Sequence, residues 1–503
     1  MRIRPMPHPI RTLALAILLG LAVGCPADDA GDPSRAVATT QHEVEGWRSV
    51  PQPATANPME PAHTGAVSSP PNFVLIVVDT LRADHLAHYG YERDTTRHLD
   101  GLRRRATIFD NAYSTAPWTG PSTISIHTGL STIRHGANAH GDRIPDEAIT
   151  LAEYLSDAGY ATHGISFNPN VSRKTGFDAG FDVFDDAHRS STSYPDISQM
   201  TQKVYEWAEA APTQPFFLYL HPMNVHGPYR VPPPRQADLL GTPPSREFKY
   251  YDGEVMHPLM RDPERDKDAL RASVSPAYLQ SLIDQYDTAV RYSMDQIAFM
   301  IGILAERGLL ENTVLILTSD HGEELFDHGG FSHGYSLYRE LLHVPLYLHL
   351  PGQTTPGKRD HLVSTIDILP TVLELADIEP RATPDGISLL TPSDLVPGDR
   401  LIIQQTSWPK RAVGLSAIRG RHHFIDLERS YDHPEPSIRL FDLGADHAEQ
   451  HDLAAVRPEQ ITELRGTLTT RIEALAHQQR LDAPRNVLGQ MDMEQLRALG
   501  YVE

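Results

Sequence analysis

The sequence predicts an α/β fold in which buried strands alternate with helices, followed by a smaller antiparallel sheet. Two observations lead to this prediction. Continuous apolar runs rich in β-branched residues, which are typical of buried parallel strands, recur between segments with helical periodicity. After about residue 400 the pattern changes to that of a smaller antiparallel sheet. The length of 503 residues favours one large domain plus a smaller one.

The expected elements follow in chain order. Strands of the main fold are predicted at Phe73–Val78, Phe216–Leu220, Thr313–Thr318 and Val344–Leu350. Helices are predicted at Leu151–Gly159, Tyr278–Gly308 and Ser364–Ala376, the last with a kink at Pro370. The smaller sheet is predicted to contain strands at Leu401–Thr406 and Ala412–Asp426, before an amphipathic helix at Pro458–Arg480. Ligands of such folds bind beyond the carboxyl ends of the strands.

The N-terminus has the pattern of a secretory signal. Three arginines precede an apolar run at Leu13–Val23, which is too short to span a bilayer. The run ends in Ala22-Val-Gly-Cys25, which resembles the bacterial lipobox. We therefore expect export to a bacterial cell envelope, with Cys25 lipidated and residues 26–70 as a disordered linker. The alternative is a plain cleaved signal with an incidental cysteine.

Composition excludes several function classes. The formal net charge of −21 argues against nucleic acid as a partner, because such proteins usually present a basic face. Cys25 is the only cysteine, so no intramolecular disulfide forms. A cysteine nucleophile, a zinc–thiolate site and an iron–sulfur cluster are excluded from the folded body for the same reason.

Two predicted strands end in carboxylates. Asp79 follows the first strand, and Asp320 follows the strand at Thr313–Thr318, with His321 next to it. Each aspartate alone is a common turn or helix-capping residue. Together, on strands that are candidates to be neighbours, the three side chains predict a metal site, because hard cations prefer oxygen ligands.

A hydroxyl residue stands at a predicted helix start. Thr119 precedes Gly120-Pro121, which places a proline in the first helical turn. The structural interpretation is a threonine N-cap. The functional one is a nucleophile at a helix N-terminus, where free N–H groups and the macrodipole favour sulfate or phosphate. A metal ion beside the hydroxyl would favour its alkoxide.

Three of the 26 histidines stand out. His226, His328 and His333 lie in glycine-rich loops close to predicted strand ends. Most histidines are surface or packing residues, but this placement makes the three candidates for general acids or anion ligands.

These pieces occur in the order found in the type I sulfatases of the alkaline-phosphatase superfamily. The segment Asn312-Thr-Val-Leu-Ile-Leu-Thr-Ser-Asp-His-Gly-Glu323 resembles that family's second metal strand. The Thr119-Gly-Pro-Ser segment resembles its nucleophile motif, and His226-Gly-Pro-Tyr229 resembles its central histidine loop. Further motifs extend the resemblance to Leu440-Phe-Asp-Leu443. It implies a catalytic domain at 71–400 and a small-sheet subdomain with a tail at 401–503.

The resemblance also implies a fold and a set of roles. The fold would be a large mixed, mostly parallel sheet between helices, with a small C-terminal antiparallel sheet. Asp79, Asp320 and His321 would bind one divalent cation together with Thr119, with Ca²⁺ or Mg²⁺ favoured and Mn²⁺ or Zn²⁺ less so. His226 and His333 would contact the transferred group or protonate the leaving oxygen.

The chain departs from the family at the nucleophile. These sulfatases carry Cys or Ser at the Thr119 position, which is oxidised to formylglycine, and threonine cannot give that aldehyde because its β-carbon bears a methyl. Thr123 replaces the motif's arginine, and Thr80 replaces its second aspartate. Asn168 and Asn170 stand near the place of its lysine–histidine pair.

Three functions remain open at this point. The first is a hydrolase of sulfate or phosphate esters that uses Thr119. The second is a threonine-dependent phosphodiesterase or phosphoryl transferase acting on envelope lipids or glycans, as in relatives within the superfamily. The third is a non-catalytic relative that binds anions or glycans.

Overall fold

The structure of the protein is a computed structural model of the 503-residue chain. It describes residues 70–186, 195–229, 231–232, 274–408, 412–429, 435–478 and 480–484. The expected signal segment, Cys25 and almost all of the expected linker therefore lie outside the described residues. In the described ranges, no helix combines the length and the apolar character that crossing a membrane requires.

The main sheet has eight strands in the order β10-β2-β9-β6-β1-β5-β3-β4. Their bounds are β1 Asn72–Val78, β2 Thr107–Tyr113, β3 Ala161–Ser166, β4 Val183–Asp185, β5 Phe216–His221, β6 Thr313–Ser319, β9 Leu346–His349 and β10 Gly357–Ser364. Among these described strands, only β9 runs antiparallel to its neighbours, β2 and β6. The sheet is thus mixed and mostly parallel, as the sequence and the resemblance predict.

The central strand β1 faces a core on each side, because successive side chains of a strand point to opposite faces. Phe73, Leu75 and Val77 pack in one apolar cluster with residues of α5, α7 and α14. Val74, Ile76 and Val78 pack in a second cluster with residues of α8 and α12. All seven β1 residues are buried, which explains why the strand is a continuous apolar run.

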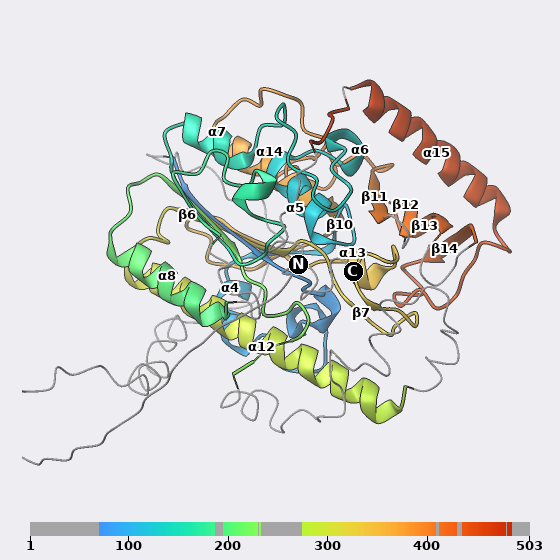
Figure 1. The fold of residues 1–503 in the computed structure, drawn as a ribbon, viewed down its shortest axis with the longest axis horizontal. Coiled ribbons are helices and arrows are strands. Elements are labelled where there is room, and N and C mark those ends of the chain that lie inside the picture. The colour runs from blue at the N-terminus through green and yellow to red at the C-terminus, as the bar shows by residue number, and fades with distance from the viewer. Residues whose placement is uncertain are drawn as a thin grey trace, which may run out of the picture. The chain divides into compact units, whose positions relative to one another are not determined.

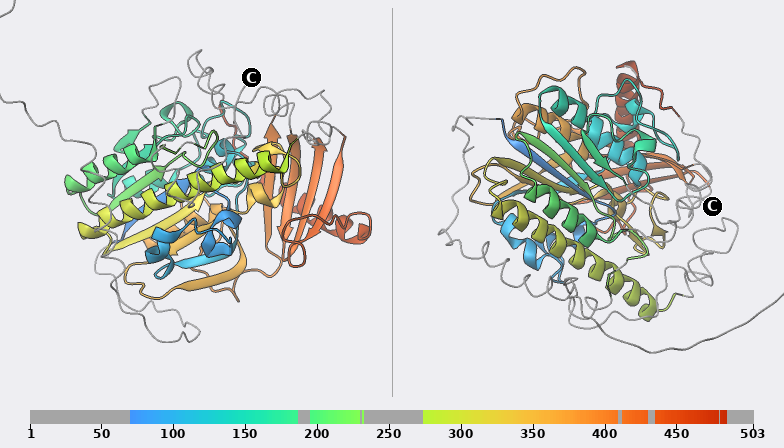
Figure 2. Two further views of the ribbon diagram at one scale, coloured as in Figure 1. Left: turned by 90° about the horizontal axis from the view of Figure 1, so that it is seen from below. Right: turned by 60° about the vertical axis from the view of Figure 1, so that its left-hand side comes forward.

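Helices cover both faces of the sheet (Figure 1). The α-helices are α4 Asp100–Arg103, α5 Thr119–Thr128, α6 Thr132–His135, α7 Leu151–Asp157, α8 Ile197–Glu209, α12 Pro276–Glu306, α13 Arg339–Leu342, α14 Ile368–Leu375 and α15 Pro458–His477. Short 3-10 helices are η1 Ala83–His85, η2 Ala87–Tyr89, η3 Arg97–Leu99, η4 Arg173–Thr175 and η5 Thr365–Asp367. The pair α8 and α12 lies on the opposite side of the sheet from α5, α7 and α14 (Figures 1 and 2).

A second sheet of four antiparallel strands lies beside the main one (Figure 2). It contains β11 Leu401–Trp408, β12 Ala412–Arg419, β13 His422–Arg429 and β14 Ser437–Asp442. One of its faces packs with α13 in a shared apolar cluster, and the other packs against α15. A two-stranded ribbon of β7 Glu324–Leu325 and β8 Phe331–Ser332 follows the end of β6.

The predicted elements are confirmed in type, with two corrections. The predicted helix at Ser364–Ala376 begins only at Ile368, because β10 extends to Ser364 and η5 follows it. Pro370 therefore lies in the first turn of α14, where proline is tolerated without a kink. The predicted strand at Ala412–Asp426 is two strands, joined by a turn in which Gly420 takes a φ of +56°.

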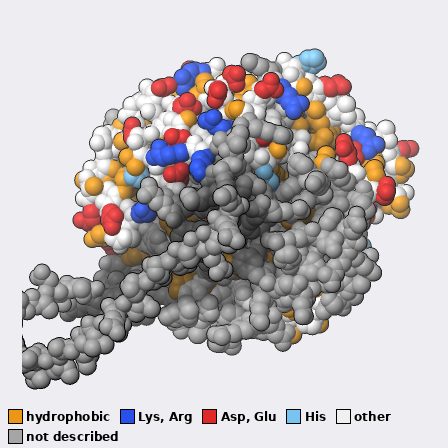
Figure 3. Space-filling model, viewed as in Figure 1, with side chains coloured by type: hydrophobic (Ala, Val, Ile, Leu, Met, Phe, Trp, Pro, Cys, Tyr) orange, Lys and Arg blue, Asp and Glu red, His pale blue; other side chains and the backbone are white. Residues whose placement is uncertain are grey.

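Charges of both signs are mixed on the described surface. On the face of the molecule seen in Figure 3, Asp and Glu side chains alternate with Lys and Arg side chains over the atoms that the structure describes. The chain's excess of acidic residues is therefore not visible as a single acidic field on this face.

Candidate active site

The site lies at the carboxyl edge of four neighbouring parallel strands. In the order β6-β1-β5-β3, these strands are followed or ended by Asp320, Asp79, His221 and Asn168. Val78 of β1 is paired with Ser319 of β6, so the two aspartates that come next lie side by side. The sheet register thus brings together carboxylates that are 241 positions apart in the sequence.

Asp79, Asp320 and His321 form a compact group of metal-ligating atoms. One atom from each lies within 4.8 Å of the others, and all three side chains are fully buried. Asp320 Oδ1 accepts hydrogen bonds from the backbone N–H groups of Thr80 at 3.2 Å and His321 at 2.9 Å. Asp79 Oδ1 and Asp320 Oδ2 have no hydrogen-bond partner within the described part of the chain. Buried carboxylate oxygens without donors fit a cation, because such oxygens need a compensating charge.

A backbone hydrogen bond sets the tautomer of His321. Its Nδ1 lies 2.8 Å from the carbonyl oxygen of Gly322, so Nδ1 carries the proton and donates. Nε2 is then the acceptor nitrogen, and it lies 3.8 Å from Asp79 Oδ1 and 3.4 Å from Asp320 Oδ2. This arrangement, with the outer nitrogen fixed by a carbonyl, is the usual one for a metal-ligating histidine.

The site's electrostatics favour a bound cation. Burial and the neighbouring Asp79 carboxylate raise the pKa of Asp320 well above its usual range. Burial would also raise the pKa of Asp79, but its hydrogen bond with His221 and the charges of His226 and His221 lower it. Burial, together with the electrostatic interaction with His333, lowers the pKa of His321 well below its usual range, so His321 is neutral and able to act as a ligand.

Thr119 lies against this group, as the first residue of α5. Its Oγ1 is 3.2 Å from His321 Nε2, and its side chain is fully buried. The helix begins here because Trp118 is extended and Pro121 stands in the first turn. The hydroxyl therefore combines two features of an anion-binding nucleophile, namely a helix N-terminus and adjacent ligand atoms.

Asn168 and His221 complete the surroundings of Asp79. Asn168 Nδ2 donates to Asp79 Oδ2 and also to Thr119 Oγ1, the latter at 3.3 Å. His221 Nε2 lies 3.4 Å from Asp79 Oδ2, and its Nδ1 lies 2.8 Å from the Tyr219 hydroxyl. His221 was not predicted as a site residue, and its place at the end of a buried strand is the one signal that could have found it.

The two candidate histidines from the loops lie together. The ring of His333 is 4.6 Å from that of His321 and 4.9 Å from that of His226, centroid to centroid. His333 Nδ1 bonds to the Glu323 carboxylate at 2.8 Å, and His226 Nδ1 donates to the Gly227 carbonyl at 2.7 Å. Burial lowers the pKa of His226, although Asp79 opposes this effect. Glu323 was not predicted from the sequence, and it orients His333.

His328 has other neighbours. Its Nδ1 lies 2.6 Å from Glu340 Oε1, and its Nε2 lies 3.0 Å from the Glu449 carbonyl. Its ring stacks on Tyr338 at 3.7 Å between centroids. These contacts tie the β7–β8 ribbon to α13 and to the segment after β14. The partners of His328 are therefore structural, and none of them is a partner of Thr119.

The fold and the candidate metal site are together typical of one class of proteins, the hydrolases with an alkaline-phosphatase-like fold. The family model described as Sulfatase matches residues 71–378. The chain belongs to the sulfatase family, a family of sulfuric ester hydrolases whose members typically bind a divalent metal.

Two relatives illustrate the sequence similarity. An arylsulfatase of Clostridium perfringens is 26% identical over 391 residues, which are 65% of this chain and 78% of the relative. The iduronate 2-sulfatase of Mus musculus is 27% identical over 334 residues, which are 57% of this chain and 60% of the relative.

A solved structure supports the fold. A phosphonate monoester hydrolase of Agrobacterium radiobacter aligns with a TM-score of 0.64 at 16% identity, over 80% of this chain and 95% of that chain. The likeness confirms the fold class that the resemblance predicts.

Proposed function

We propose that the protein hydrolyses sulfate or phosphate esters with Thr119 as the nucleophile. One observation carries this proposal. The Thr119 hydroxyl stands at the N-terminus of α5, 3.2 Å from His321 Nε2, beside the carboxylate oxygens of Asp79 and Asp320 that lack donors. The alternative of a threonine N-cap is wrong, because Trp118 is the N-cap residue of α5 and no side chain caps this helix.

Asp79, Asp320, His321 and Thr119 would hold one divalent cation. Their donor set is mostly oxygen with one imidazole nitrogen, which favours Ca²⁺ or Mg²⁺ and also accommodates Mn²⁺ or Zn²⁺. When bound, the cation supplies a positive charge that favours the alkoxide of Thr119 and offsets charge on the transferred group. The two buried carboxylates provide the reason for binding, since burial and the neighbouring Asp79 raise the cost of ionising Asp320.

In the first step, the Thr119 hydroxyl gives its proton to solvent, its Oγ attacks the sulfur or phosphorus atom, and the bond to the leaving oxygen breaks. His333, whose Nδ1 bonds to Glu323, would protonate that oxygen, with His226 beside it. The N-terminal N–H groups of α5 stabilise the anionic group. In the second step, water attacks the same sulfur or phosphorus atom and releases Thr119.

The identity of the nucleophile favours phosphate over sulfate. A formylglycine hydrate expels sulfate by collapsing to an aldehyde, whereas a sulfated threonine has no such route and needs attack at sulfur. A phosphorylated threonine is easier to resolve by water. A threonine-dependent phosphodiesterase is therefore the second candidate, and its substrate would come from envelope lipids or glycans.

The experiment is an assay of the metal-stripped full chain with 4-nitrophenyl sulfate, 4-nitrophenyl phosphate and bis(4-nitrophenyl) phosphate, each with Ca²⁺, Mg²⁺, Mn²⁺ or Zn²⁺. We expect release of nitrophenol that falls by a factor on the order of 10⁴ in Thr119→Ala, as when other hydroxyl nucleophiles are removed. Thr462→Ala, on the exposed side of α15, is the matched control. If Thr119→Ala keeps its activity, Thr119 is not the nucleophile. If a folded, cation-binding chain hydrolyses none of the three substrates, the non-catalytic alternative is favoured.

We also propose that the chain is exported and anchored by a lipid on Cys25. Support comes from the basic residues, the short apolar run and the Ala22-Val-Gly-Cys25 sequence. Mass spectrometry of the N-terminal peptide would then show a diacylated Cys25, and Cys25→Ser would release the protein from the membrane fraction. A cleaved but unmodified N-terminus would identify a plain secretory signal instead.

A further inference from the structure

A buried tyrosine–histidine pair on β5 contacts Asp79. His221 is the last residue of β5, and its Nε2 lies 3.4 Å from Asp79 Oδ2. Its Nδ1 lies 2.8 Å from the hydroxyl of Tyr219, two residues earlier on the same strand. The two side chains point to the same face of β5, because successive side chains of a strand alternate. The strand therefore builds a hydrogen-bonded chain from Tyr219 through His221 to Asp79.

Hydrogen-bond chemistry fixes the direction of each bond in this chain of three groups. An ionised carboxylate only accepts, so His221 Nε2 carries the proton and donates to Asp79. In the neutral ring Nδ1 is then the acceptor, and the Tyr219 hydroxyl donates to it. Burial raises the pKa of Tyr219 well above its usual range, so the hydroxyl keeps the proton that it donates. Tyr219 thus fixes both the tautomer and the orientation of the His221 ring.

The two oxygens of the Asp79 carboxylate have different surroundings. Oδ2 accepts from His221 and from Asn168 Nδ2. Oδ1 has no hydrogen-bond partner among the residues that the structure describes, and it lies 3.8 Å from His321 Nε2. Two donors on one oxygen fix the plane of the carboxylate, so the other oxygen keeps its direction toward the candidate metal site.

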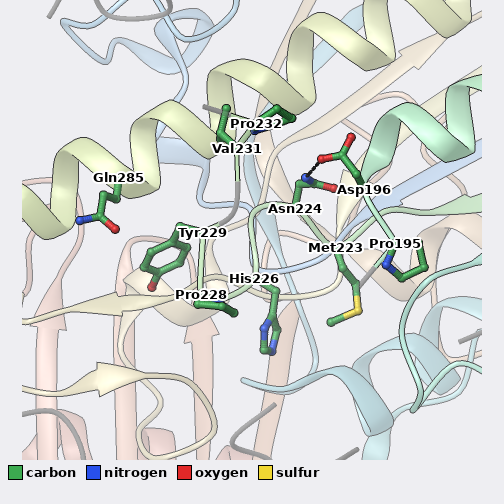
Figure 4. Close-up of a pocket in the computed structure, with 10 residues that line it drawn as sticks. All are labelled: Pro195, Asp196, Met223, Asn224, His226, Pro228, Tyr229, Val231, Pro232 and Gln285. Carbon is green, nitrogen blue, oxygen red and sulfur yellow. Dashed lines mark hydrogen bonds between the residues drawn. The ribbon is translucent and has the colours of Figure 1, made fainter. Parts of the chain in front are cut away.

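Tyr219 and His221 have no side open to a substrate. Both side chains are fully buried, and neither is among the described residues that line the pocket of about 440 Å³ beside the site. The chain reaches that pocket only after β5 has ended, where Figure 4 draws Met223 and His226. Any effect of Tyr219 on a reaction therefore passes through His221 and Asp79, which makes Tyr219 a positioning residue rather than a catalytic one.

We propose that Tyr219 and His221 form a positioning pair that sets the affinity of the candidate metal site by orienting Asp79. The proposal rests on the proposed function, which places a divalent cation at that site. It adds to the site a hydrogen-bonded chain whose far end, the Tyr219 hydroxyl, contacts neither the cation nor the substrate.

The test measures cation affinity by calorimetric titration of Ca²⁺, Mg²⁺, Mn²⁺ or Zn²⁺ into the metal-stripped full chain. We expect Tyr219→Phe to raise the Kd of the tightest-binding cation by about tenfold, because outer partners of metal ligands typically contribute a factor of about 10 to 100. The substitution keeps the aromatic ring, so the packing of Tyr219 against His127 is retained. An unchanged Kd in Tyr219→Phe would overturn the proposal.

A second tyrosine–histidine pair provides the matched control. The Tyr347 hydroxyl lies 3.1 Å from His88 Nδ1, and His88 Nε2 lies 3.2 Å from Asp100 Oδ1, which is the same order of groups outside the site. Tyr347 is fully buried, like Tyr219. Tyr347→Phe should therefore lower the Tm of the cation-free chain about as much as Tyr219→Phe does, and it should leave the Kd unchanged. An equal rise of the Kd in both variants would attribute the effect to general destabilisation and contradict the proposal.

A double variant tests whether Tyr219 acts through His221. His221→Leu removes a donor to Asp79, so it should raise the Kd by about 10- to 100-fold. In that background Tyr219→Phe should change the Kd by less than about twofold, because the route to Asp79 is already lost. It should also raise the Tm, since it removes a buried hydroxyl whose acceptor is gone, so the double variant stays informative if His221→Leu alone folds poorly. A further tenfold rise of the Kd would show that Tyr219 acts by another route and would overturn the proposal.

Binding and turnover together separate this proposal from the proposed function. A Kd that rises in Tyr219→Phe, with a wild type that binds cation but hydrolyses none of the nitrophenyl esters, would support the positioning pair and refute the hydrolase. Hydrolysis by the wild type, with the same Kd in wild type and Tyr219→Phe, would do the reverse. A wild type that binds none of the four cations would overturn both.

Discussion

Asn168 joins the proposed nucleophile to a carboxylate of the candidate metal site. Its side-chain amide donates to both Thr119 Oγ1 and Asp79 Oδ2, and its own Oδ1 accepts from the backbone N–H of Asn170 at 2.7 Å. The amide is therefore held on both sides. A hydroxyl fixed by such a donor stays in one rotamer, which matters because a nucleophile must keep near-attack geometry.

We expect Asn168→Ala to lower kcat/KM by about 10- to 100-fold, the usual effect of losing an outer partner of a metal site. The loss should fall mainly on kcat, because Asn168 contacts the proposed nucleophile Thr119 and its neighbour Asp79. Initial-rate kinetics with the preferred ester will show this, and Asn111→Ala on β2 serves as the control. A change confined to Tm, with kinetics intact, would make Asn168 a purely structural residue.

At the scale of residues, the sequence predicts which residues lie in the site better than it predicts which side chains they contact. Asp79, Asp320, His321 and Thr119 are visible because each follows a strand or starts a helix, and the structure does bring the four together. His221 and Glu323 are not visible, since their contacts depend on which strands are neighbours and on how the loop after β6 turns back. His328 shares the loop composition of His333, and only the tertiary contacts distinguish them.

At the scale of elements, β1 and β6 carry like charges to the same edge of the sheet. A cation that binds there at about one hundred times its Kd stabilises the folded chain by about 2.7 kcal/mol. We therefore expect EDTA to lower the Tm, and re-addition of the activating cation to restore it, as followed by thermal unfolding.

The Asp320→Asn variant tests the same candidate cation site by removing one of its two carboxylates. Without cation, this variant should be at least as stable as the wild type, because a repulsion between two buried carboxylates is removed. Added cation should raise the Tm of this variant only slightly. If added cation does not raise the Tm of the wild type either, the carboxylates do not form a cation site.

The contact between the β7–β8 ribbon and α13 is expected to depend on pH. Burial alone would lower the pKa of His328, but its hydrogen bond with Glu340 raises it to about 9. The ordinary value in an unfolded chain is about 6.5, so the folded state holds this proton more tightly. The stabilisation is complete below pH ~6.5 and is lost as the pH rises to about 9.

The measurement is the Tm of the wild type and of His328→Gln across this pH range. The difference between the two should be largest near pH 6 and should disappear above about pH 9. A constant difference would mean that His328 stabilises the ribbon by its stacking on Tyr338 rather than by its charge.

Elements with strong apolar periodicity are predictable, and edge elements are not. The strands β1, β5 and β6 are buried on both faces and stand out as apolar runs. By contrast, β10 at the edge of the sheet alternates half-buried and exposed residues and contains charged side chains, so the sequence does not distinguish it from a loop or a helix start.

At the scale of the whole described fold, the two sheets share one apolar cluster. It combines Tyr113 of β2 and Leu341 of α13 with Ile402, Ile418 and Phe441 of the smaller sheet. Backbone bonding also crosses between them, since the Gln405 N–H donates to the Thr115 carbonyl at 3.0 Å. The smaller sheet is therefore expected to unfold together with the main one.

Truncating this shared cluster tests that expectation. Phe441 is 2% exposed, so Phe441→Ala should cost about 3–5 kcal/mol and lower the temperature of a single calorimetric transition. Leu395→Ala, at a residue that is 68% exposed, is the control and should change little. Two separate transitions, with only one of them shifted, would show that the sheets unfold independently.

The position of β1 has a consequence for biosynthesis. This strand is the first of the main sheet to leave the ribosome, yet it lies between β5 and β6, whose sequences come more than 130 and 230 residues later. Until both are made, β1 offers two unpaired edges and two apolar faces, a state prone to wrong pairing. Nascent chains that end before Asp320 lack half of the carboxylate pair, so a cation at the candidate site would be captured only late in synthesis or after it. Chaperones that hold the emerging chain extended would therefore protect β1 above all other segments.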